Sequence, residues 1–384
     1  MPRSYNLFTP GPVSVRTEVL QALALPARHH RTAEFEALWV DLGRRLADVF
    51  RTGDPVAILS GSGTAAMEAA VANLFSASDR VLVPVAGRFA RRWVEICKAF
   101  DVDAVALPLK YGESPSADDV SSALGKDHSI RGILLVHCET STGSLTDLES
   151  IARAVRDAEA AAGHPILTCS DSITSLAIDP LETDAWGLDA VVSASQKGLL
   201  SPPGLALVVL SKRAREALDG IRQRRYYFDL RRYLGTPHPP FTPAVPLCLG
   251  LDRSLDLVLG VGLEKIWKAN AASASALRTL FEIAGFVPVA RRQAGGAVAF
   301  WVGEVRADAI FETLREEHGV LIARGQDDLE GKILRVSAIG KGRGEILLFV
   351  RAFAETLAKV GRPIDEARAI EAAGNLLEGT RIWE

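Results

Sequence analysis

Short apolar runs alternate with amphipathic segments over the first two thirds of the chain. The runs are rich in β-branched residues and cover 56–59, 80–85, 104–107, 132–137, 165–169, 190–194 and 206–210. Helical patterns separate most of them, at 64–75, 88–100, 117–124 and 148–163. This alternation predicts an α/β fold with a mostly parallel seven-stranded sheet covered on both faces. Because only a Pro-Pro-Gly turn separates the last two runs, we expect the last strand to be antiparallel.

The pattern changes after about residue 210. Residues 222–246 are rich in Arg, Tyr and Pro and predict a long surface excursion, of the kind that is usually functional. A long helix is expected from about 250 to 284, then strands near 297–302 and 333–337, helices near 307–317 and 343–359, and an exposed helical tail over 363–384. We therefore expect an N-terminal arm (1–15), a large domain (16–255) and a small C-terminal α+β domain (256–384).

Composition narrows the class of protein. The 384 residues include 44 Lys and Arg against 47 Asp and Glu, a net charge of −3 that gives no electrostatic reason to expect a nucleic-acid or membrane partner. No apolar run is long enough to span a bilayer, and the N-terminus has no signal-peptide pattern. Four scattered cysteines form no zinc or CxxC spacing, so we expect no metal and a reducing, cytoplasmic location.

A glycine turn follows the first strand and opens a helix. Free N–H groups and the hydroxyls of Ser62 and Thr64, beside Gly63, would make a phosphate cradle. The segment also fits the dinucleotide pattern GxGxxA, which requires an acidic residue at the end of the next strand. That strand ends Val83-Pro84-Val85-Ala86-Gly87, without an acid, so a nicotinamide cofactor is disfavoured. A phosphate cradle and an ordinary capped turn both remain open.

Two further residues follow predicted strands at the same sheet edge. Asp171 comes after the strand at 165–169, and Lys197 comes after the strand at 190–194. Carboxyl ends of parallel strands share one edge, where ligands bind. Taken alone, Asp171 could be an ordinary loop residue and Lys197 an ordinary surface residue. Together with the cradle they form the set that pyridoxal phosphate requires: a lysine for the Schiff base, an acid for the pyridine nitrogen and a helix start for the phosphate.

Seven motifs carry a family resemblance. They are TPGP (9–12), SGSGTAAMEAA (60–70), GRFARRW (87–93), HCETSTG (137–143), SDSITS (170–175), SASQKGLLSPPG (193–204) and KILRVS (332–337). With them the chain resembles the class V aminotransferases, which are fold-type I pyridoxal-phosphate enzymes. Within that family it is most similar to the alanine–glyoxylate and serine–pyruvate (serine–glyoxylate) aminotransferases. The resemblance implies that the large domain binds the cofactor.

The resemblance also implies roles for individual residues. Lys197 would form the Schiff base and move the substrate proton, Asp171 would pair with the pyridine nitrogen, and Phe89 would stack on the ring. Ser141 would bond near the phenolic oxygen. The phosphate would be held by four residues of the same chain: Ser62, Gly63, Thr64 and Gln196.

Further roles concern the substrate and a second subunit. Arg335 would bind the substrate's α-carboxylate through its planar guanidinium. Thr242 would reach the phosphate of a neighbouring subunit, so the resemblance implies a homodimer with shared sites. Pro239 stands where some relatives have a tyrosine. His30 and Arg31 would either meet an anionic substrate or form a basic surface loop, and both alternatives stay open.

The implied reaction is a ping-pong transfer of an amino group from alanine or serine to glyoxylate or pyruvate. Transaminases for 2-aminoethylphosphonate or ureidoglycine are alternatives, because a few pocket side chains separate them. A lyase of the cysteine desulfurase type is weaker, because it needs a cysteine in the small domain and the last one here is Cys248. A nicotinamide-dependent dehydrogenase lacks its ribose-binding acid.

Overall fold

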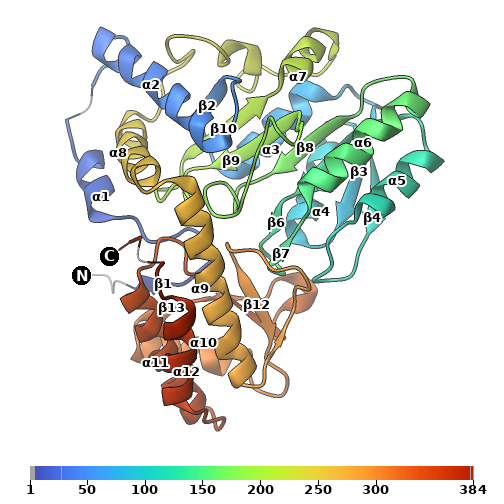
Figure 1. The fold of residues 1–384 in the computed structure, drawn as a ribbon. Coiled ribbons are helices and arrows are strands. Elements are labelled where there is room, and N and C mark those ends of the chain that lie inside the picture. Colours follow the sequence, from blue (N-terminus) through green and yellow to red (C-terminus); the bar gives the residue numbers. More distant parts are fainter. Residues whose placement is uncertain (1–4, 27, 381, 384) are drawn as a thin grey trace.

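The large sheet carries the alternation seen in the sequence. The computed structural model describes residues 5–26, 28–380 and 382–383. Within them a seven-stranded sheet has the order β2-β10-β9-β8-β5-β3-β4 (Figure 1). Its strands are β2 (Val56–Ser60), β3 (Arg80–Val85), β4 (Asp103–Pro108), β5 (Ile130–Val136), β8 (Leu167–Asp171), β9 (Ala190–Ala194) and β10 (Leu205–Leu210). Neighbours pair in parallel except β10, which is antiparallel to β9 and β2, so both sheet predictions are confirmed.

Helices cover both faces of this sheet. One core includes α3 (Gly63–Leu74) and α4 (Arg88–Ala99). The other includes α2 (Ala33–Phe50), α5 (Ala117–Lys126), α6 (Leu148–Ala162) and α8 (Val245–Val261), with α1 (Thr17–Leu23) packed on α8. Along β2, Val56 and Ile58 join the second core, and Ala57 and Leu59 join the first. Successive side chains of a strand point to opposite faces, so a doubly covered strand is apolar throughout.

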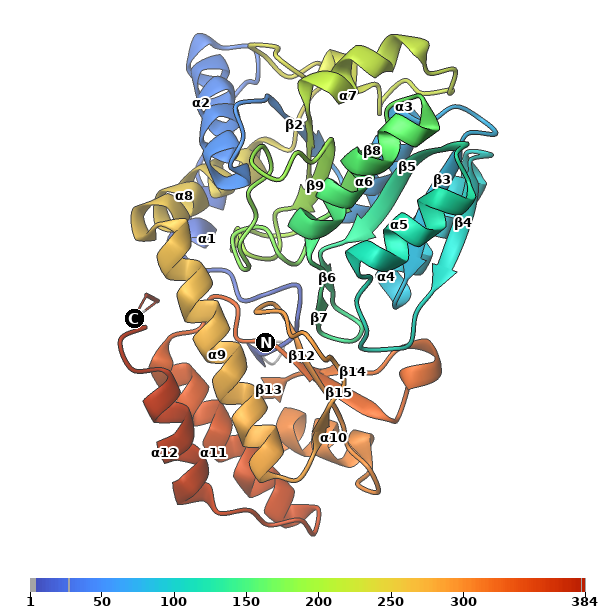
Figure 2. The same cartoon turned by 45° about the vertical axis from the view of Figure 1, so that its right-hand side comes forward.

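A smaller antiparallel sheet lies below the large one (Figure 2). Its order is β11-β12-β15-β14, with β11 (Val287–Pro288), β12 (Val298–Trp301), β14 (Ala323–Arg324) and β15 (Ile333–Val336). It shares a core with α9 (Leu263–Ile283), α10 (Ala307–Glu317), α11 (Arg343–Lys359) and α12 (Glu366–Leu376). The expected C-terminal α+β part is confirmed. The N-terminal β1 (Asn6–Leu7) pairs with β13 (Val320–Leu321), so Phe8 is buried in the C-terminal core.

Two expectations for the C-terminal half were wrong in detail. The single helix expected over 250–284 is two helices, α8 and α9, separated by Gly262 at φ +90°. That backbone conformation favours glycine and ends α8 before the chain turns into the small sheet's layer. The tail is helical as expected, but one side is buried: Ala369, Ala373 and Leu377 lie in the C-terminal core. Spaced at i, i+4 and i+8 along α12 and its C-cap, they form a buried apolar stripe.

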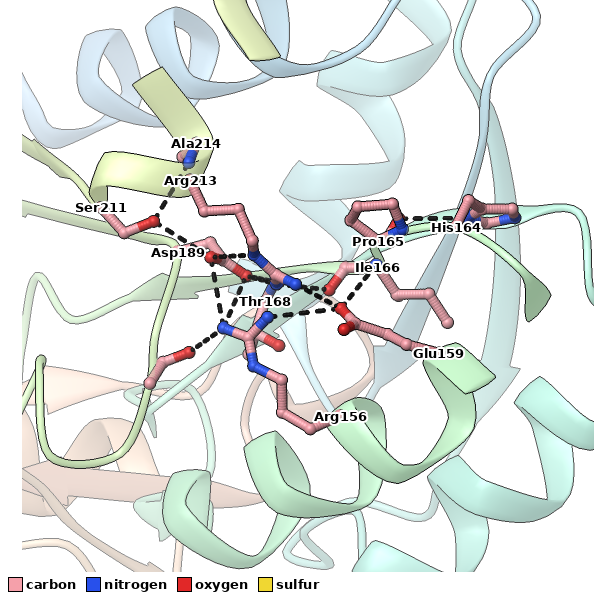
Figure 3. Close-up of polar contacts among 11 residues, drawn as sticks. Arg156, Glu159, His164, Pro165, Ile166, Thr168, Asp189, Ser211, Arg213 and Ala214 are labelled. Carbon is pink, nitrogen blue, oxygen red and sulfur yellow. Dashed lines mark hydrogen bonds and ion pairs between the residues drawn. The ribbon is translucent and has the colours of Figure 1, made fainter. Parts of the chain in front are cut away.

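An ionic cluster fixes the amino edge of the large sheet (Figure 3). Asp171 and Lys197 lie at the opposite, carboxyl edge. The fully buried carboxylate of Asp189, just before β9, accepts a hydrogen bond from the backbone N–H of Thr168 at 2.9 Å. It also accepts from Arg213 Nε at 3.0 Å and from Arg156 Nη2 at 3.3 Å. The cluster therefore ties β8, β9 and α6 together.

Candidate active site

A cavity of about 310 Å³ opens at the carboxyl edge of the large sheet. Its walls come from the N-terminal segment, the β2–α3 turn, α4 and the segments after β5, β8 and β9. The lining residues are Gly11, Pro12, Ser62, Gly63, Thr64, Phe89, Arg92, Cys138, Thr140, Asp171, Ile173, Thr174, Gln196, Lys197 and Pro203. Seven of the ten residues to which the sequence assigned a catalytic, cofactor or substrate role are among them.

The β2–α3 turn forms one end of this cavity. Ser62 is the N-cap of α3, and its side chain makes no capping hydrogen bond, so its hydroxyl is available to a ligand. The first backbone N–H groups of α3 have no partner within the helix and carry its positive dipole end. Gly63 is required by packing, because a Cβ there would lie 2.5 Å from Cδ1 of Ile173. Ser62, Gly63 and Thr64 thus provide donors for an anion.

Asp171 is the last residue of β8 and is buried. Its Oδ1 accepts a hydrogen bond from the backbone N–H of Ile173 at 2.9 Å. Burial raises the pKa of the Asp171 carboxyl to about 7, and the charge of Glu139 adds to that rise. Arg92 and Lys197 act in the opposite direction. A cationic group beside Asp171 would therefore be paired with its carboxylate in a dry environment.

Lys197 lies in the turn after β9, and its side chain enters the cavity. Its Nζ donates a hydrogen bond to the carbonyl oxygen of Pro10 at 2.7 Å. Burial lowers the pKa of the ammonium group to about 8, against the opposing charges of Cys138 and Asp171. An amine with this pKa is partly neutral at physiological pH and can act as a nucleophile or a base.

The start of α4 presents Phe89 to the cavity. The carboxylate of Glu139 caps the helix: it accepts from the backbone N–H of Phe89 at 3.2 Å and of Ala90 at 3.0 Å. This contact needs a glycine before the helix, because a Cβ at Gly87 would lie 2.6 Å from Cδ of Glu139. The buried carboxylate therefore holds the aromatic ring at the cavity wall.

Gln196 and Ser141 differ in their relation to the cavity. Gln196 lines it, and its buried Oε1 has no hydrogen-bond partner among the described residues. Ser141 is not among the lining residues. Its hydroxyl donates to Glu139 and accepts from the backbone N–H of Arg88 at 3.1 Å. The neighbouring Thr140 lines the cavity instead.

Arg335 and Thr242 lie outside the lining of this cavity. Arg335, on β15, is buried and donates from Nε to the carbonyl of Arg324 at 2.9 Å and from Nη1 to the carbonyl of Thr140 at 3.1 Å. Burial lowers the pKa of its guanidinium to about 10. Thr242 is exposed in the segment before α8.

The basic loop before α2 also lies apart from the cavity. His30 is half-buried and does not line the cavity. Arg31 donates from Nη1 to the carbonyl of Pro239 at 3.1 Å, within the 222–246 excursion.

Several lining residues were not singled out from the sequence. Arg92 is the clearest: it follows Phe89 by three positions on α4, so both face the same side of the helix. That spacing was the signal that could have identified it. Cys138, Thr140, Ile173, Thr174 and Pro203 gave no comparable signal, because their place in the wall depends on how separate loops meet.

The residues present fit pyridoxal phosphate. One cavity holds a lysine with a lowered pKa, a buried strand-end carboxyl, an aromatic ring and a helix start with free donors. The unpartnered Oε1 of Gln196 is a further polar atom with room for a ligand contact. Within the described part of the chain, no group of His, Cys, Asp and Glu side chains could hold a metal ion. The same residues include no helix long and apolar enough to cross a membrane.

Known proteins with similar sequences and structures are aminotransferases. A solved aspartate aminotransferase of subgroup IV from Thermus thermophilus is 38% identical, with a TM-score of 0.86 over 92% of this chain and 99% of that one. The L-aspartate–glyoxylate aminotransferase of Paracoccus denitrificans is 31% identical over 96% of this chain and 94% of its own length. The serine–glyoxylate aminotransferase of Methylorubrum extorquens is 29% identical over 98% of this chain and 96% of its own length.

The match to the family itself covers most of the chain. The class-V aminotransferase family matches residues 17–337, a span that includes the glycine turn, the strand-end acid, the lysine and Arg335. The fold is that of the fold-type I aminotransferases. The chain therefore belongs to the class-V aminotransferase family, is an aminotransferase, and uses pyridoxal phosphate as its cofactor.

Proposed function

We propose that the protein moves an amino group from a small amino acid, alanine or serine, to a 2-oxo acid, glyoxylate or pyruvate, in two ping-pong half reactions. The observation that carries the proposal is the buried guanidinium of Arg335, which does not line the cavity itself but donates from Nη1 to the carbonyl of the lining residue Thr140 at 3.1 Å. A guanidinium is suited to an α-carboxylate, which it binds through two parallel hydrogen bonds. The cavity's 310 Å³ must also hold the cofactor, and this favours a short substrate side chain.

The chain's own groups would act around the cofactor, which supplies the electron sink for the reaction. Arg335 would orient the substrate by its carboxylate. Lys197, with its lowered pKa, would take and return the α-proton at Nζ. Asp171 would hold a proton on the ring nitrogen, because its carboxylate is buried and faces few other partners. Phe89 and the N-terminal Gly11–Pro12 segment would keep water from the reacting atoms.

Aspartate is a second candidate donor. The Thermus thermophilus and Paracoccus denitrificans proteins are named for aspartate. The Paracoccus denitrificans and Methylorubrum extorquens proteins are named for glyoxylate. A dicarboxylate would need a second cation near Arg335. Arg88 acts electrostatically on Arg335, and it forms an ion pair with Asp327 at 2.6 Å that a second carboxylate could exchange with. Donors such as 2-aminoethylphosphonate and ureidoglycine remain alternatives.

A panel of coupled assays tests the proposal. Alanine, serine, aspartate, 2-aminoethylphosphonate and ureidoglycine would each be offered with glyoxylate and with pyruvate, and kcat/KM compared. We expect alanine or serine with glyoxylate to be best. A preference of tenfold or more for aspartate would replace the donor assignment, and absence of turnover with both alanine and serine would contradict it.

We further propose a homodimer in the cytoplasm, with the 222–246 excursion entering the partner's site. Thr242 is exposed and does not line its own chain's cavity, and Tyr226 in the same excursion is 67% exposed. The described cysteines are all buried and unpaired, which is typical of a reducing compartment. Sedimentation velocity of the active protein tests the assembly: we expect a dimer, and a fully active monomer would contradict it.

A further inference from the structure

The side chain of Arg92 faces the phosphate cradle from α4. It lines the same cavity as Ser62, Gly63 and Thr64. Its Nη1 donates a hydrogen bond to the hydroxyl oxygen of Thr64 at 3.2 Å. Its guanidinium carbon lies 5.0 Å from the centre of the Phe89 ring, one helical turn earlier. These two contacts fix the direction of the guanidinium toward the start of α3.

Arg92 differs from its neighbours on α4 in having no counter-ion. Arg88 pairs with Asp327 at 2.6 Å, and Arg91 pairs with Asp328 at 3.7 Å. In the described part of the chain, no carboxylate lies within ion-pair distance of Arg92. The carboxyl of Asp171 in the same cavity attracts Arg92 but lies beyond ion-pair distance. A cation that lines a small cavity without a direct partner is costly, because it is partly removed from water. The arrangement therefore points to an anionic ligand group in the cavity.

The cradle itself lacks a full positive charge. A phosphate monoester carries about −1.5 to −2 charges near neutral pH. Ser62, Gly63 and Thr64 carry no charge, and a helix N-terminus offers roughly half an elementary charge. Besides Arg92, the cavity's only cationic lining residue among those described is Lys197, whose Nζ contacts the Pro10 carbonyl.

We propose that Arg92 completes the phosphate end of the cofactor site by holding the Thr64 hydroxyl in place and supplying the positive charge that the cradle lacks. The Thr64 oxygen accepts from Arg92, so its own hydrogen is free to be donated to a phosphate oxygen. Arg92 is thus a positioning residue for Thr64 as well as a charge for the phosphate. The proposal rests on the cofactor alone and is independent of the amino donor.

Equilibrium binding to the cofactor-free protein tests this role without an activity readout. Wild type and Arg92→Gln would be titrated with pyridoxal phosphate and with pyridoxal, which lacks the phosphate. We expect Arg92→Gln to weaken pyridoxal phosphate binding by about 10- to 100-fold and to change pyridoxal binding by less than about threefold. Arg92→Lys should recover part of the loss, because it keeps the charge without the planar fork.

Two controls separate this role from a structural one. Arg91→Gln removes the neighbouring arginine, which is outside the cavity, and should leave both affinities unchanged. In a Thr64→Val background, Arg92→Gln should have a smaller effect than in wild type. Unchanged pyridoxal phosphate binding in a folded Arg92→Gln variant would overturn the proposal. Equal losses for both ligands would overturn it too, because the effect would then lie away from the phosphate.

Discussion

The side-chain nitrogen of Lys197 donates a hydrogen bond to the backbone carbonyl of Pro10, at 2.7 Å. The next residue, Gly11, packs so closely that a Cβ there would lie 2.3 Å from the lysine nitrogen. The N-terminal segment thus covers the lysine at the sheet edge and helps to bury it. This burial lowers the lysine pKa to about 8, so that the amine is reactive near neutral pH.

Replacing Lys197 by alanine should abolish transamination. The variant loses the only side-chain amine in the described cavity, and with it the group that we propose binds the cofactor covalently and carries the proton. We expect kcat to fall by more than about 10³-fold and the visible absorption of the bound cofactor to change. Lys212→Ala, on the exposed surface, is the matched control. If Lys197→Ala kept wild-type turnover, Lys197 would not be the residue that binds the cofactor and moves the proton.

The same lysine should destabilise the cofactor-free protein at neutral pH. Its pKa is 10.5 in the unfolded chain and about 8 when folded, so the unfolded state binds more protons between these values and stability rises with pH across that window. Below pH 8 the full destabilisation by the buried, protonated lysine is present, on the order of 3 kcal/mol. Lys197→Met should therefore be more stable than wild type near pH 7, by up to that amount, with the difference shrinking toward pH 10.5. Urea unfolding at several pH values measures the difference in unfolding free energy between the two proteins. A difference that does not change with pH would contradict a destabilising Lys197.

Asp171→Asn should uncouple cofactor binding from catalysis. The amide keeps the shape of the side chain but carries no charge to hold a proton on the ring nitrogen. We expect kcat to fall by at least about 100-fold while the protein still binds pyridoxal phosphate. Asp171→Glu should retain more activity, because the charge remains. Similar kcat values for the Asn variant and wild type would show that the ring-nitrogen contact is not needed.

Gly63→Ala should weaken cofactor binding. The new methyl group would meet the end of Ile173 at 2.5 Å and displace either that side chain or the start of α3. We expect about a tenfold loss of pyridoxal phosphate affinity, which Ile173→Val should partly restore. Gly43→Ala on α2 is the control, since a Cβ there meets nothing within 4 Å and should stabilise the helix slightly. If Gly63→Ala and Gly43→Ala bound pyridoxal phosphate with the same affinity, the close packing at Gly63 would not matter for the cofactor.

Much of the fold was predictable because apolar runs and short connections carry strong local signals. The antiparallel β10 followed from the short turn between two apolar runs. The break at Gly262 was missed because the apolar pattern continues across it, and only the backbone angle separates the two helices. The pairing of β1 with β13 joins two-residue strands from opposite ends of the chain, which no local pattern encodes.

Some residues of the candidate site were also predictable from local sequence signals, and others were not. Asp171 and Lys197 were predictable because strand-end positions in a parallel sheet meet at one edge. Whether Thr140 or Ser141 faces the cavity depends on the contact of Ser141 with Glu139, a tertiary feature. Arg92 had a helical-spacing signal, but its missing counter-ion is visible only when the acids of the small sheet's loop are in place.

Asp189→Asn should reduce stability more than any surface substitution. The Asp189 side chain is fully buried, and the cluster holds the cations of Arg156 and Arg213 against it. Removing its charge leaves Glu159 as the remaining counter-ion of both guanidinium groups, and burial already raises the pKa of the Asp189 carboxyl, so we expect a loss of about 1–3 kcal/mol. Urea unfolding of the cofactor-free protein would measure the loss, with Asp157→Asn on the exposed side of α6 as the control. Because the cluster lies at the edge opposite Lys197, kcat/KM of the folded variant should stay within about threefold of wild type. A destabilisation below about 1 kcal/mol would mean that Glu159, which also pairs with both arginines, compensates for the lost carboxylate.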